Sequence, residues 1–462
     1  MPQQDPFGPH TLPYGVFTTA DAPERRRIGV RYGDRVLDAG AAAAARGSAH
    51  TELLAAPDLG PLMAAGRPVW QAVRAEVRDW LTGTTAAETG SNPGTGAGST
   101  TGTGAGSTTG TGAGDTTGTG STTGLDPVSD VSGEPFLLPL SDVALHLPFE
   151  VADYVDFYAS EHHATNVGRI FRPDGDALTP NWKHLPIGYH GRAGTVVVSG
   201  TEVVRPSGQR KAPADAAPTF GPSRRLDIEA EVGFVVGVPS SAPVPLEGFR
   251  DHVFGVCLVN DWSARDLQAW EYVPLGPFLG KSFATSVSAW ITPLDAFDEA
   301  RTAPPERTHP LLPYLDDSAA EPGGLDIRIE VALGGEPLTS PPFASMYWTA
   351  AQQLAHMTVN GATLRTGDLY ASGTVSGPEE HQLGCLLELT KGKGPFLQDG
   401  DEVTITAWAP GPDGSRIGLG EVTGRIAPAT TTETTTTEAT ATAAGAATPA
   451  KSDPTATAAG AP

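Results

Sequence analysis

Polar side chains that could do chemistry are concentrated between Asn260 and Ser286. The apolar run before them, Val253 to Val259, predicts a buried strand, so Asp261 is expected where that strand ends and the chain turns outward. The polar residues that follow are Arg265, Gln268, Tyr272 and Lys281. Because aromatic residues and Gly-Pro turns lie between these groups, the stretch predicts the floor of an active site. The alternative is a strand, a short helix and a hairpin whose polar residues face water.

Acidic residues in three strand-like segments could converge on a metal ion. Glu229 and Glu231 stand two residues apart, and therefore on the same face of a strand. Two neighbouring carboxylates repel each other unless a cation lies between them. Asp156 and Asp261 each add a carboxylate beside aromatic residues. Such an all-oxygen set suits Mg²⁺ or Ca²⁺ rather than zinc, although a solvent-facing strand is the simpler interpretation of the two glutamates alone.

A histidine and a glutamate are candidates for proton transfer. His163 follows a candidate metal ligand by seven residues and is well placed to act as a base, whereas most lone histidines are packed or exposed without a catalytic role. Glu388 stands inside the apolar run Cys385 to Leu389, and its burial is costly unless it has a partner such as a histidine. Arg172 and Tyr189 could orient an anionic substrate, the arginine through two parallel hydrogen bonds to a carboxylate.

Charge and composition argue against several classes of function. The 462 residues carry a formal net charge of −23, and phosphate binding needs clustered Lys and Arg, so neither nucleic acid nor an anionic membrane is expected as a partner. Cys257 and Cys385 lie far apart in apolar runs and predict neither a disulfide nor a thiolate metal site. The chain lacks an apolar run of the ~20 residues that a membrane span needs, and its N-terminus does not resemble a secretion signal. We therefore expect a soluble, cytoplasmic protein.

The first part of the chain combines a small mixed domain with a repeat. Residues 1–82 begin this domain, with a hairpin around Gly33 and a helix over residues 68–81. Residues 83–133 contain an eight-residue Gly, Thr, Ser and Ala repeat without large apolar side chains, so we expect a disordered insert. The Thr- and Ala-rich tail, residues 428–462, leads to the same expectation.

Short strand-like runs separated by Gly, Pro, Asn and Asp dominate the main domain, residues 134–427. The runs span residues 196–198, 230–236, 253–259, 327–333, 386–389 and 403–407. One segment, residues 345–357, predicts a helix. Many short strands and few helices predict a β-rich (α+β) fold, a roll or a sandwich, rather than a doubly wound sheet.

Six motifs resemble the fumarylacetoacetate hydrolase family. They are Asp-Tyr-x-Asp-Phe-Tyr at 153–158, His-Ala-Thr-Asn at 163–166, Pro-Asn-Trp at 180–182, Leu-Pro-x-Gly-Tyr-His-Gly-Arg at 185–192, Asn-Asp-Trp-Ser-Ala-Arg-Asp at 260–266, and Trp-Glu-Tyr through Lys-Ser-Phe at 270–283. The last motif, with Leu-Pro-Tyr-Gly-Val-Phe at 12–17, is typical of the tyrosine-catabolic branch of the family. The likeness runs from about Leu12 to Val422, apart from the insert. It implies a small N-terminal SH3-like barrel domain followed by a C-terminal β-roll catalytic domain, in a homodimer.

The resemblance also implies roles for individual residues. The metal-site residues would be Asp156, Glu229, Glu231 and Asp261, together with Lys281 and Thr285 in the magnesium region. The catalytic residues would be His163 as the base, Glu388 as its partner, and Lys281, Arg265 and Gln268 around the reacting oxygens. The substrate contacts would be Tyr158, Arg172, Tyr189, Arg265, Gln268, Tyr272 and Thr374. The implied cofactor is a divalent cation, Mg²⁺, Ca²⁺ or both.

The implied reaction is hydrolysis of a carbon–carbon bond in 4-fumarylacetoacetate, a diketo diacid, to fumarate and acetoacetate in tyrosine and phenylalanine catabolism. Attack of water on a carbonyl and departure of an enolate both build negative charge on oxygen, which a metal ion, Lys281 and Arg265 would stabilise. One alternative is a relative that hydrolyses acylpyruvates or decarboxylates oxaloacetate with the same metal-binding residues. Another is a metal- and ligand-binding module without activity.

Overall fold

The computed structural model describes residues 5–83 and 136–430. The predicted disordered insert (83–133) and tail (428–462) lie outside these ranges, apart from their first residues. All the elements described below belong to one compact unit that ends at Ala429. Among the helices of the described ranges, none has both the length and the hydropathy that crossing a lipid bilayer requires.

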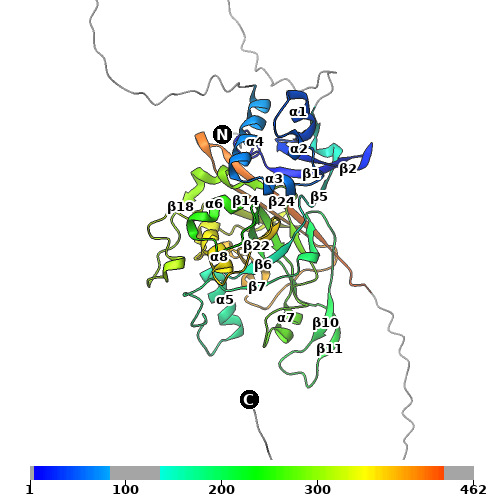
Figure 1. The fold of residues 1–462 in the computed structure, drawn as a ribbon. Coiled ribbons are helices and arrows are strands. Elements are labelled where there is room, and N and C mark those ends of the chain that lie inside the picture. The colour runs from blue at the N-terminus through cyan, green and yellow to red at the C-terminus, as the bar shows by residue number, and fades with distance from the viewer. Residues whose placement is uncertain (1–4, 84–135, 431–462) are drawn as a thin grey trace, which may run out of the picture. The chain divides into compact units, whose positions relative to one another are not determined.

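The N-terminal domain is built on an antiparallel five-stranded sheet with the order β4-β3-β2-β1-β5 (Figure 1). Its strands are β1 (Tyr14–Thr19), β2 (Ala22–Tyr32), β3 (Arg35–Asp38), β4 (Leu137–Pro139) and β5 (Val143–His146). The predicted hairpin is confirmed as β2 and β3, joined through Gly33, whose φ of 61° suits glycine. Because β4 and β5 follow the insert in the chain, residues beyond the 1–82 segment complete this sheet.

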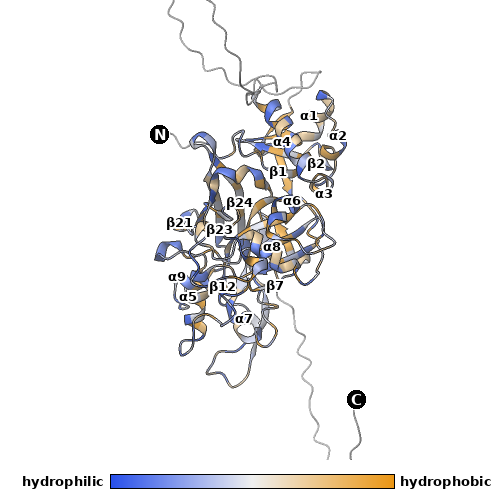
Figure 2. Cartoon of the chain, turned by 60° about the vertical axis from the view of Figure 1, so that its left-hand side comes forward, coloured by the Kyte–Doolittle hydropathy of each residue, from blue (hydrophilic) through white to orange (hydrophobic). Residues whose placement is uncertain are grey.

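Four helices accompany the N-terminal sheet. They are α1 (Ala39–Arg46), α2 (Thr51–Leu54), α3 (Gly60–Ala64) and α4 (Arg67–Thr82). The helix predicted over residues 68–81 is confirmed as α4, which begins with Pro68 in its first turn and ends at Gly83. Figure 2 shows hydrophobic and hydrophilic residues mixed along α4, as expected for a helix with one buried face. On that face the Trp70 ring meets the Phe254 ring of the second domain edge-on at 5.3 Å.

Two sheets, of eight and five strands, form most of the second domain. The first, with the order β7-β6-β22-β13-β14-β16-β8, contains β6 (Asp153–Phe157), β7 (Gly188–His190), β8 (Val196–Val198), β13 (Ala230–Val236), β14 (Val253–Asp261), β16 (Thr285–Val287) and β22 (Asp368–Ala371), and β17 (Thr292–Pro293) also pairs with β14. The second, with the order β21-β20-β23-β24-β9, contains β9 (Val203–Val204), β20 (Arg328–Leu333), β21 (Glu336–Thr339), β23 (Glu402–Pro410) and β24 (Arg416–Ala427). Three strand pairs flank them: β10 (Ser207–Arg210) with β11 (Thr219–Pro222), β12 (Leu226–Asp227) with β15 (Ser263–Ala264), and β18 (Arg301–Thr302) with β19 (Gly324–Leu325). The prediction of a β-rich fold is therefore confirmed.

The helices of the second domain differ in part from the predictions. They are α5 (Glu161–Phe171), α6 (Phe249–His252), α7 (Arg265–Glu271), α8 (Ala350–Thr358) and α9 (Leu386–Leu389). The predicted strand over residues 386–389 is wrong, because α9 is a single helical turn there. The predicted helix 345–357 is confirmed as α8 but begins later, because Thr349 and Gln352 form a capping box.

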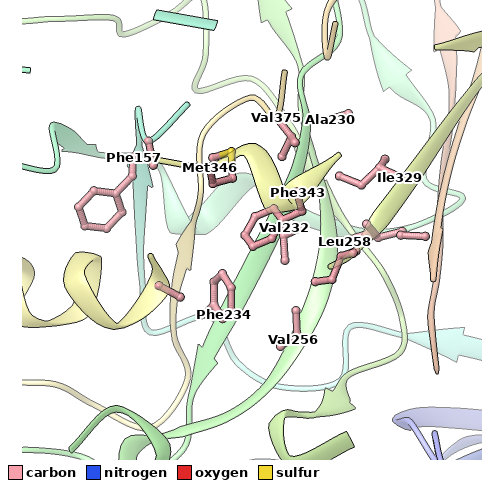
Figure 3. Packing of buried hydrophobic residues seen from close by; sticks show 14 of the residues in the cluster. Phe157, Ala230, Val232, Phe234, Val256, Leu258, Ile329, Phe343, Met346 and Val375 are labelled. Atoms are coloured by element: carbon pink, nitrogen blue, oxygen red, sulfur yellow. The ribbon is translucent and has the colours of Figure 1, made fainter. Parts of the chain in front are cut away.

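The central strands β13 and β14 are buried along their whole length. Figure 3 shows the core on one side of these strands, which includes Val232, Phe234, Val256, Leu258 and Ile329. Val235 points to the opposite face and packs in a second core together with residues of the N-terminal domain. Since both faces are covered, the groups at the ends of these two strands, Glu231 and Asp261, stand on a rigid support.

Candidate active site

A cavity of about 420 Å³ opens beside the ends of these strands, a size typical of ligand pockets. Its walls come from β6, α5, β7, α7 and the loops that follow α7 and β22. The predicted site residues that line it are Asp156, Tyr158, His163, Arg172, Tyr189, Glu229, Arg265, Gln268, Tyr272, Lys281 and Thr374. The remaining predicted residues are Glu231, Asp261, Thr285 and Glu388, and the contacts below connect them to this wall. The structure thus brings all the predicted site residues to one region.

Four buried carboxylates form a cluster at one side of the cavity. Asp156 lies near the end of β6, Glu229 directly before β13, Glu231 at the start of β13, and Asp261 at the end of β14. Each of the four contributes an oxygen, and these oxygens all lie within 4.8 Å of one another. The side chains converge because β6, β22, β13 and β14 are neighbours in one sheet.

Two cations and a threonine hydroxyl contact the cluster. Lys281 Nζ donates to Glu229 Oε2 and, at 2.6 Å, to Asp261 Oδ2. Arg265 Nη1 donates to Glu229 Oε1 at 2.7 Å, and Thr285 Oγ1 donates to Asp261 Oδ1 at 3.2 Å. Burial alone would raise the pKa of Glu229, but Lys281 and Arg265 hold that pKa far below its ordinary value.

The other side of the cluster lacks positive charge. Both carboxylate oxygens of Glu231 and Oδ1 of Asp156 are buried without a hydrogen-bond partner among residues 5–83 and 136–430. Burial, followed by repulsion from neighbouring carboxylates, raises the pKa of both groups well above their ordinary values. Unpaired acceptors are costly to bury unless a cation joins them. The four carboxylates therefore fit a divalent metal ion, whose ligands would be oxygen atoms.

A buried histidine and glutamate are joined by a short hydrogen bond. His163 lies in the first turn of α5, where its backbone N–H donates to the capping Ser160 Oγ at 3.2 Å. His163 Nδ1 stands 2.6 Å from Glu388 Oε2, so Glu388 has the histidine partner that its burial predicted. The same carboxylate accepts hydrogen bonds from Asn166 Nδ2, Ser376 Oγ and Cys385 Sγ. Burial alone would raise the pKa of Glu388, but His163 and these donors lower it to about 2.

Several polar groups remain available to a ligand in the cavity. Arg265 Nη2 and Thr374 Oγ1 are buried and have no partner in the described part of the chain. The Tyr189 hydroxyl donates to Asp261 Oδ2 at 3.4 Å. Arg172 was expected to donate two parallel hydrogen bonds to a substrate carboxylate. In the structure two of its nitrogens already have partners, because Nη2 donates to the Ala177 carbonyl at 2.6 Å and Nε to the Asp176 carbonyl at 3.4 Å.

The sequence motifs did not indicate the groups that orient Glu388. Asn166 ends the His-Ala-Thr-Asn motif, and Ser376 lies two residues after Thr374, one of the implied substrate contacts. Neither residue type has a charge or a characteristic spacing that indicates a carboxylate partner. Their roles became visible only when the fold brought α5, α9 and the loop after β22 together.

Replacement of Gly373 by alanine is expected to destabilise the site. Gly373 has a φ of 76°, and a Cβ there would lie 2.1 Å from the Phe157 carbonyl oxygen, so the loop that carries Thr374 would have to move. We expect a lower melting temperature and a lower kcat, measured by thermal unfolding and turnover. The matched control is Gly361→Ala, where φ is 94° but no atom lies within 4 Å of the new Cβ. Equal losses in the two variants would contradict the role of the close approach.

Fold and site define a class of β-rich, two-domain enzymes in which a carboxylate cluster for a metal ion shares a cavity with a histidine–glutamate pair. The family model described as fumarylacetoacetate (FAA) hydrolase C-terminal matches residues 153–427, and the model described as fumarylacetoacetase N-terminal matches residues 10–95. The chain belongs to the fumarylacetoacetate hydrolase family.

Curated relatives and a solved structure agree with this assignment. The chain is 41% identical over 446 residues to a fumarylacetoacetase of Homo sapiens, with 92% of this chain and 96% of that protein covered. It is 38% identical over 447 residues to a fumarylacetoacetase of Arabidopsis thaliana, with the same coverage. A fumarylacetoacetate hydrolase from psychrophilic Exiguobacterium antarcticum has a TM-score of 0.50 at 16% identity, covering 90% of this chain and 99% of that chain, and it shows the likeness of the fold.

Proposed function

We propose that this chain hydrolyses 4-fumarylacetoacetate to fumarate and acetoacetate. Its family and its identity of about 40% to curated fumarylacetoacetases confirm the prediction of a hydrolase that acts on fumarylacetoacetate. The observation that carries the mechanism is the presence of His163, Lys281 and Arg265 in the wall of one cavity, next to a carboxylate cluster suited to a metal ion.

His163 is the proposed base that takes a proton from the attacking water. An ionised carboxylate only accepts hydrogen bonds, so the contact with Glu388 assigns the ring proton to Nδ1 and leaves Nε2 as the acceptor. The carboxylate also stabilises the positive charge that develops on the ring when Nε2 takes the proton. Glu388 is thus the group that orients the base and fixes its tautomer.

Lys281, Arg265 and Gln268 are the proposed donors to the oxygens on which negative charge builds. Arg265 keeps Nη2 without a described partner, and Gln268 accepts from Arg265 Nη1 through Oε1 at 3.3 Å, which leaves its amide N–H groups for the substrate. Removal of one such donor costs on the order of 3 kcal/mol in other enzymes. A divalent cation held by Asp156, Glu229, Glu231 and Asp261 supplies, when bound, further stabilisation of negative charge on the diketone oxygens.

The proposed cation is Mg²⁺ or Ca²⁺. The ligand set is entirely oxygen, which suits either ion, whereas zinc prefers nitrogen and sulfur ligands. Lys281 and Thr285, both in contact with Asp261, are proposed to belong to the same metal region.

The proposed contacts to the diketo diacid come from the remaining polar groups of the cavity wall. They are Tyr158, Arg172, Tyr189, Tyr272 and Thr374. The second candidate function is hydrolysis of acylpyruvates or decarboxylation of oxaloacetate by the same residues. A binding module without activity has less support, because a short hydrogen bond between a buried histidine and glutamate beside two cations suits proton transfer.

The proposed quaternary structure is a homodimer of cytoplasmic chains, each with an N-terminal SH3-like barrel and a C-terminal β-roll. Apolar side chains after α7 are exposed, with Leu275 at 96% and Phe278 at 68%, and a second copy of the chain would cover them. The net charge of −23 argues against nucleic acid or an anionic membrane as an additional partner. Sedimentation velocity tests the dimer: a monomer at micromolar concentration would contradict it.

The test of the proposed function is the loss of ultraviolet absorbance of fumarylacetoacetate on addition of the full chain, with and without a chelator and with Mg²⁺ or Ca²⁺ restored. We expect rapid, cation-dependent loss, with fumarate and acetoacetate as products. Turnover of an acylpyruvate or of oxaloacetate instead would favour the second candidate function. Binding without turnover of any of these substrates, in a folded protein, would favour the binding module.

Acid is expected to destabilise the protein partly through Glu388. The pKa of this group is 4.5 without neighbours and about 2 in the folded chain. Its ionised form therefore stabilises the folded state above pH ~4.5, and this contribution, on the order of 3 kcal/mol, is lost as the pH falls toward 2. Urea unfolding at pH 5 and at lower pH should show the parent losing more stability than Glu388→Gln. The control is Glu380→Gln, an exposed carboxylate. Parallel pH profiles of the parent and Glu388→Gln would contradict the prediction.

A further inference from the structure

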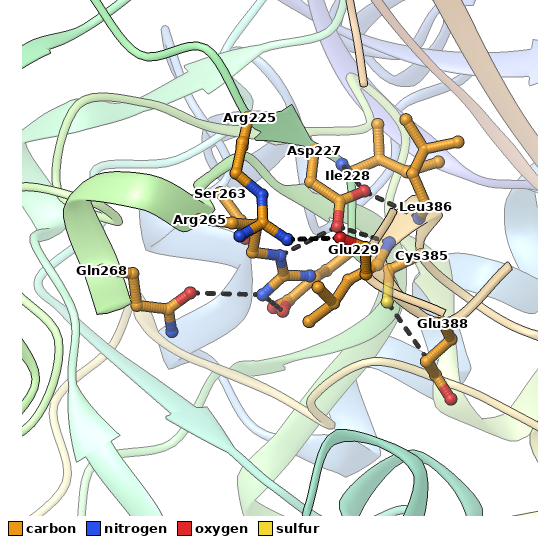
Figure 4. A network of polar contacts seen from close by, with 12 residues as sticks. Arg225, Asp227, Ile228, Glu229, Ser263, Arg265, Gln268, Cys385, Leu386 and Glu388 are labelled. Atoms are coloured by element: carbon orange, nitrogen blue, oxygen red, sulfur yellow. Dashed lines mark hydrogen bonds and ion pairs between the residues drawn. The ribbon is translucent and has the colours of Figure 1, made fainter. Parts of the chain in front are cut away.

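The carboxylate of Asp227 contacts two separate parts of the proposed catalytic machinery without lining the cavity. Asp227 ends β12 and is fully buried. Its Oδ1 accepts from the backbone N–H groups of Ile228 at 2.8 Å and Leu386 at 2.7 Å. Its Oδ2 accepts from Arg265 Nε at 2.8 Å (Figure 4). The same oxygen accepts from the Leu387 N–H at 2.9 Å. Both oxygens are therefore fully engaged.

The first connection fixes the Arg265 guanidinium. Asp227 holds Nε, and Glu229 holds Nη1 at 2.7 Å from the other side (Figure 4). A planar group held at two donors by two carboxylates has one orientation. Nη2 is then the donor without a described partner, on a residue that lines the cavity. The direction of that donor follows from the position of Asp227.

The second connection fixes the turn that carries Glu388. Helix α9 is one turn long, and its preceding residue, Cys385, provides no side-chain cap. The N–H groups of its first two residues, Leu386 and Leu387, donate instead to Asp227. A single turn has few hydrogen bonds of its own, so its placement depends on this external carboxylate. Glu388 follows one residue later and holds His163.

We propose that Asp227 is a positioning residue that ties the direction of Arg265 to the placement of Glu388, an inference that rests on the proposed function. The two oxygens of Asp227 thereby fix the position of the Arg265 donor relative to the His163 base across the cavity. The alternative is a carboxylate that supports the local fold alone, with no effect on the reaction beyond the amount of folded protein. Turnover per folded molecule distinguishes the two.

The first test compares Asp227→Asn with the parent in the full chain supplied with Mg²⁺. Asparagine keeps the size of the side chain but has no charge and only one acceptor oxygen. We expect kcat to fall roughly 10- to 100-fold, as for other groups that orient catalytic residues, with KM changed by less than about three-fold. An unchanged kcat per folded molecule would overturn the proposal.

Asp266→Asn is the matched control. Its oxygens accept from Ser223 Oγ at 2.6 Å and from the Arg224 N–H at 2.8 Å, and it lies next to Arg265 in the chain. The chemical change is identical, but neither Arg265 nor α9 loses a partner. We expect kcat of this variant to match that of the parent. A loss of kcat equal to that in Asp227→Asn would overturn the proposal.

A double-mutant cycle tests the connection through Arg265. Lysine has a single nitrogen and cannot contact Asp227 and Glu229 as the guanidinium does. The combined loss in Asp227→Asn with Arg265→Lys should therefore be smaller than the product of the two single losses. A combined loss of kcat equal to the product of the two single losses would overturn the link between the two residues.

Hydrogen exchange provides a test that does not need substrate. It remains informative even when Asp227→Asn does not fold, because it uses a different variant. In Arg265→Lys, the Asp227 carboxylate loses the hydrogen bond from the guanidinium Nε that holds it in place, so the Leu386 and Leu387 amides should exchange faster than in the parent. Unchanged exchange would overturn the proposal. A parent that does not turn over fumarylacetoacetate would overturn the proposed function, while the exchange rates would still report whether Asp227 links Arg265 to α9.

Discussion

Replacement of His163 by alanine is expected to lower kcat for fumarylacetoacetate by roughly 10²- to 10⁴-fold, the usual contribution of a positioned base. The residual carboxylate of Glu388 cannot substitute, because it does not line the cavity. Binding of Mg²⁺ should be retained, since the four carboxylates of the cluster are unchanged. Steady-state kinetics and calorimetric titration with Mg²⁺ measure the two effects separately.

Two further variants distinguish loss of the base from loss of stability. His163→Ala removes the short hydrogen bond to the buried Glu388 carboxylate, which keeps three other donors, and this should cost about 1–3 kcal/mol of stability. Adding Glu388→Gln removes the buried charge that has lost this donor, so the double variant should regain stability and stay inactive. His162→Ala changes the neighbouring, partly exposed histidine, which is not part of the cavity wall, and should keep full turnover. Turnover retained by His163→Ala would exclude it as the base.

Replacement of Glu231 by glutamine is expected to stabilise the metal-free protein and to weaken metal binding on the order of 100-fold. Both oxygens of Glu231 are buried without a described partner and face three other carboxylates. Loss of one negative charge therefore relieves repulsion when no cation is bound, and removes a ligand when one is. Thermal unfolding in chelator and calorimetric titration with Mg²⁺ and Ca²⁺ measure the two effects.

Higher metal-free stability together with lower metal affinity in Glu231→Gln is the result expected of a metal site. A stabilising salt-bridge network would instead lose stability. In the parent, cation at 100 times its Kd should add about 2.7 kcal/mol of stability, whereas Glu231→Gln should keep only about 0.4 kcal/mol of that gain at the same concentration. Glu330→Gln, on the exposed face of β20, is the control and should change neither quantity. A lower metal-free stability in Glu231→Gln, with metal affinity unchanged, would contradict the assignment.

Much of the site could be predicted because its residues stand at strand ends. The run Val253 to Val259 predicted β14, and Asp261 duly ends that strand. The spacing of Glu229 and Glu231 predicted a shared face, and both belong to the buried cluster. Period-two patterns and chain turns are local properties, so sequence alone can locate such groups.

The elements that the sequence did not predict, α9 and α5, depend on contacts that sequence patterns do not show. The run from Leu386 to Leu389 is apolar throughout, and a buried strand and a buried helical turn have the same pattern at that length. The helical turn is selected by Asp227, some 160 positions earlier, whose carboxylate accepts its first two N–H groups. Helix α5 was missed for a related reason, since its start depends on a Ser160 cap that a short polar segment does not indicate reliably.

Because β13 and β14 are buried on both faces, the rigid part of the site that carries the carboxylates is separate from the loop that faces the substrate. Glu231 and Asp261 project from strands that two cores hold in place, whereas Tyr272 and Leu275 lie in an exposed loop at the same cavity. Loop residues can therefore be exchanged to accept differently shaped substrates while the carboxylates proposed as metal ligands keep their positions. Directed evolution of this scaffold should accordingly find new selectivity in the loop after α7, and mutations in the strands should mostly cost solubility and expression.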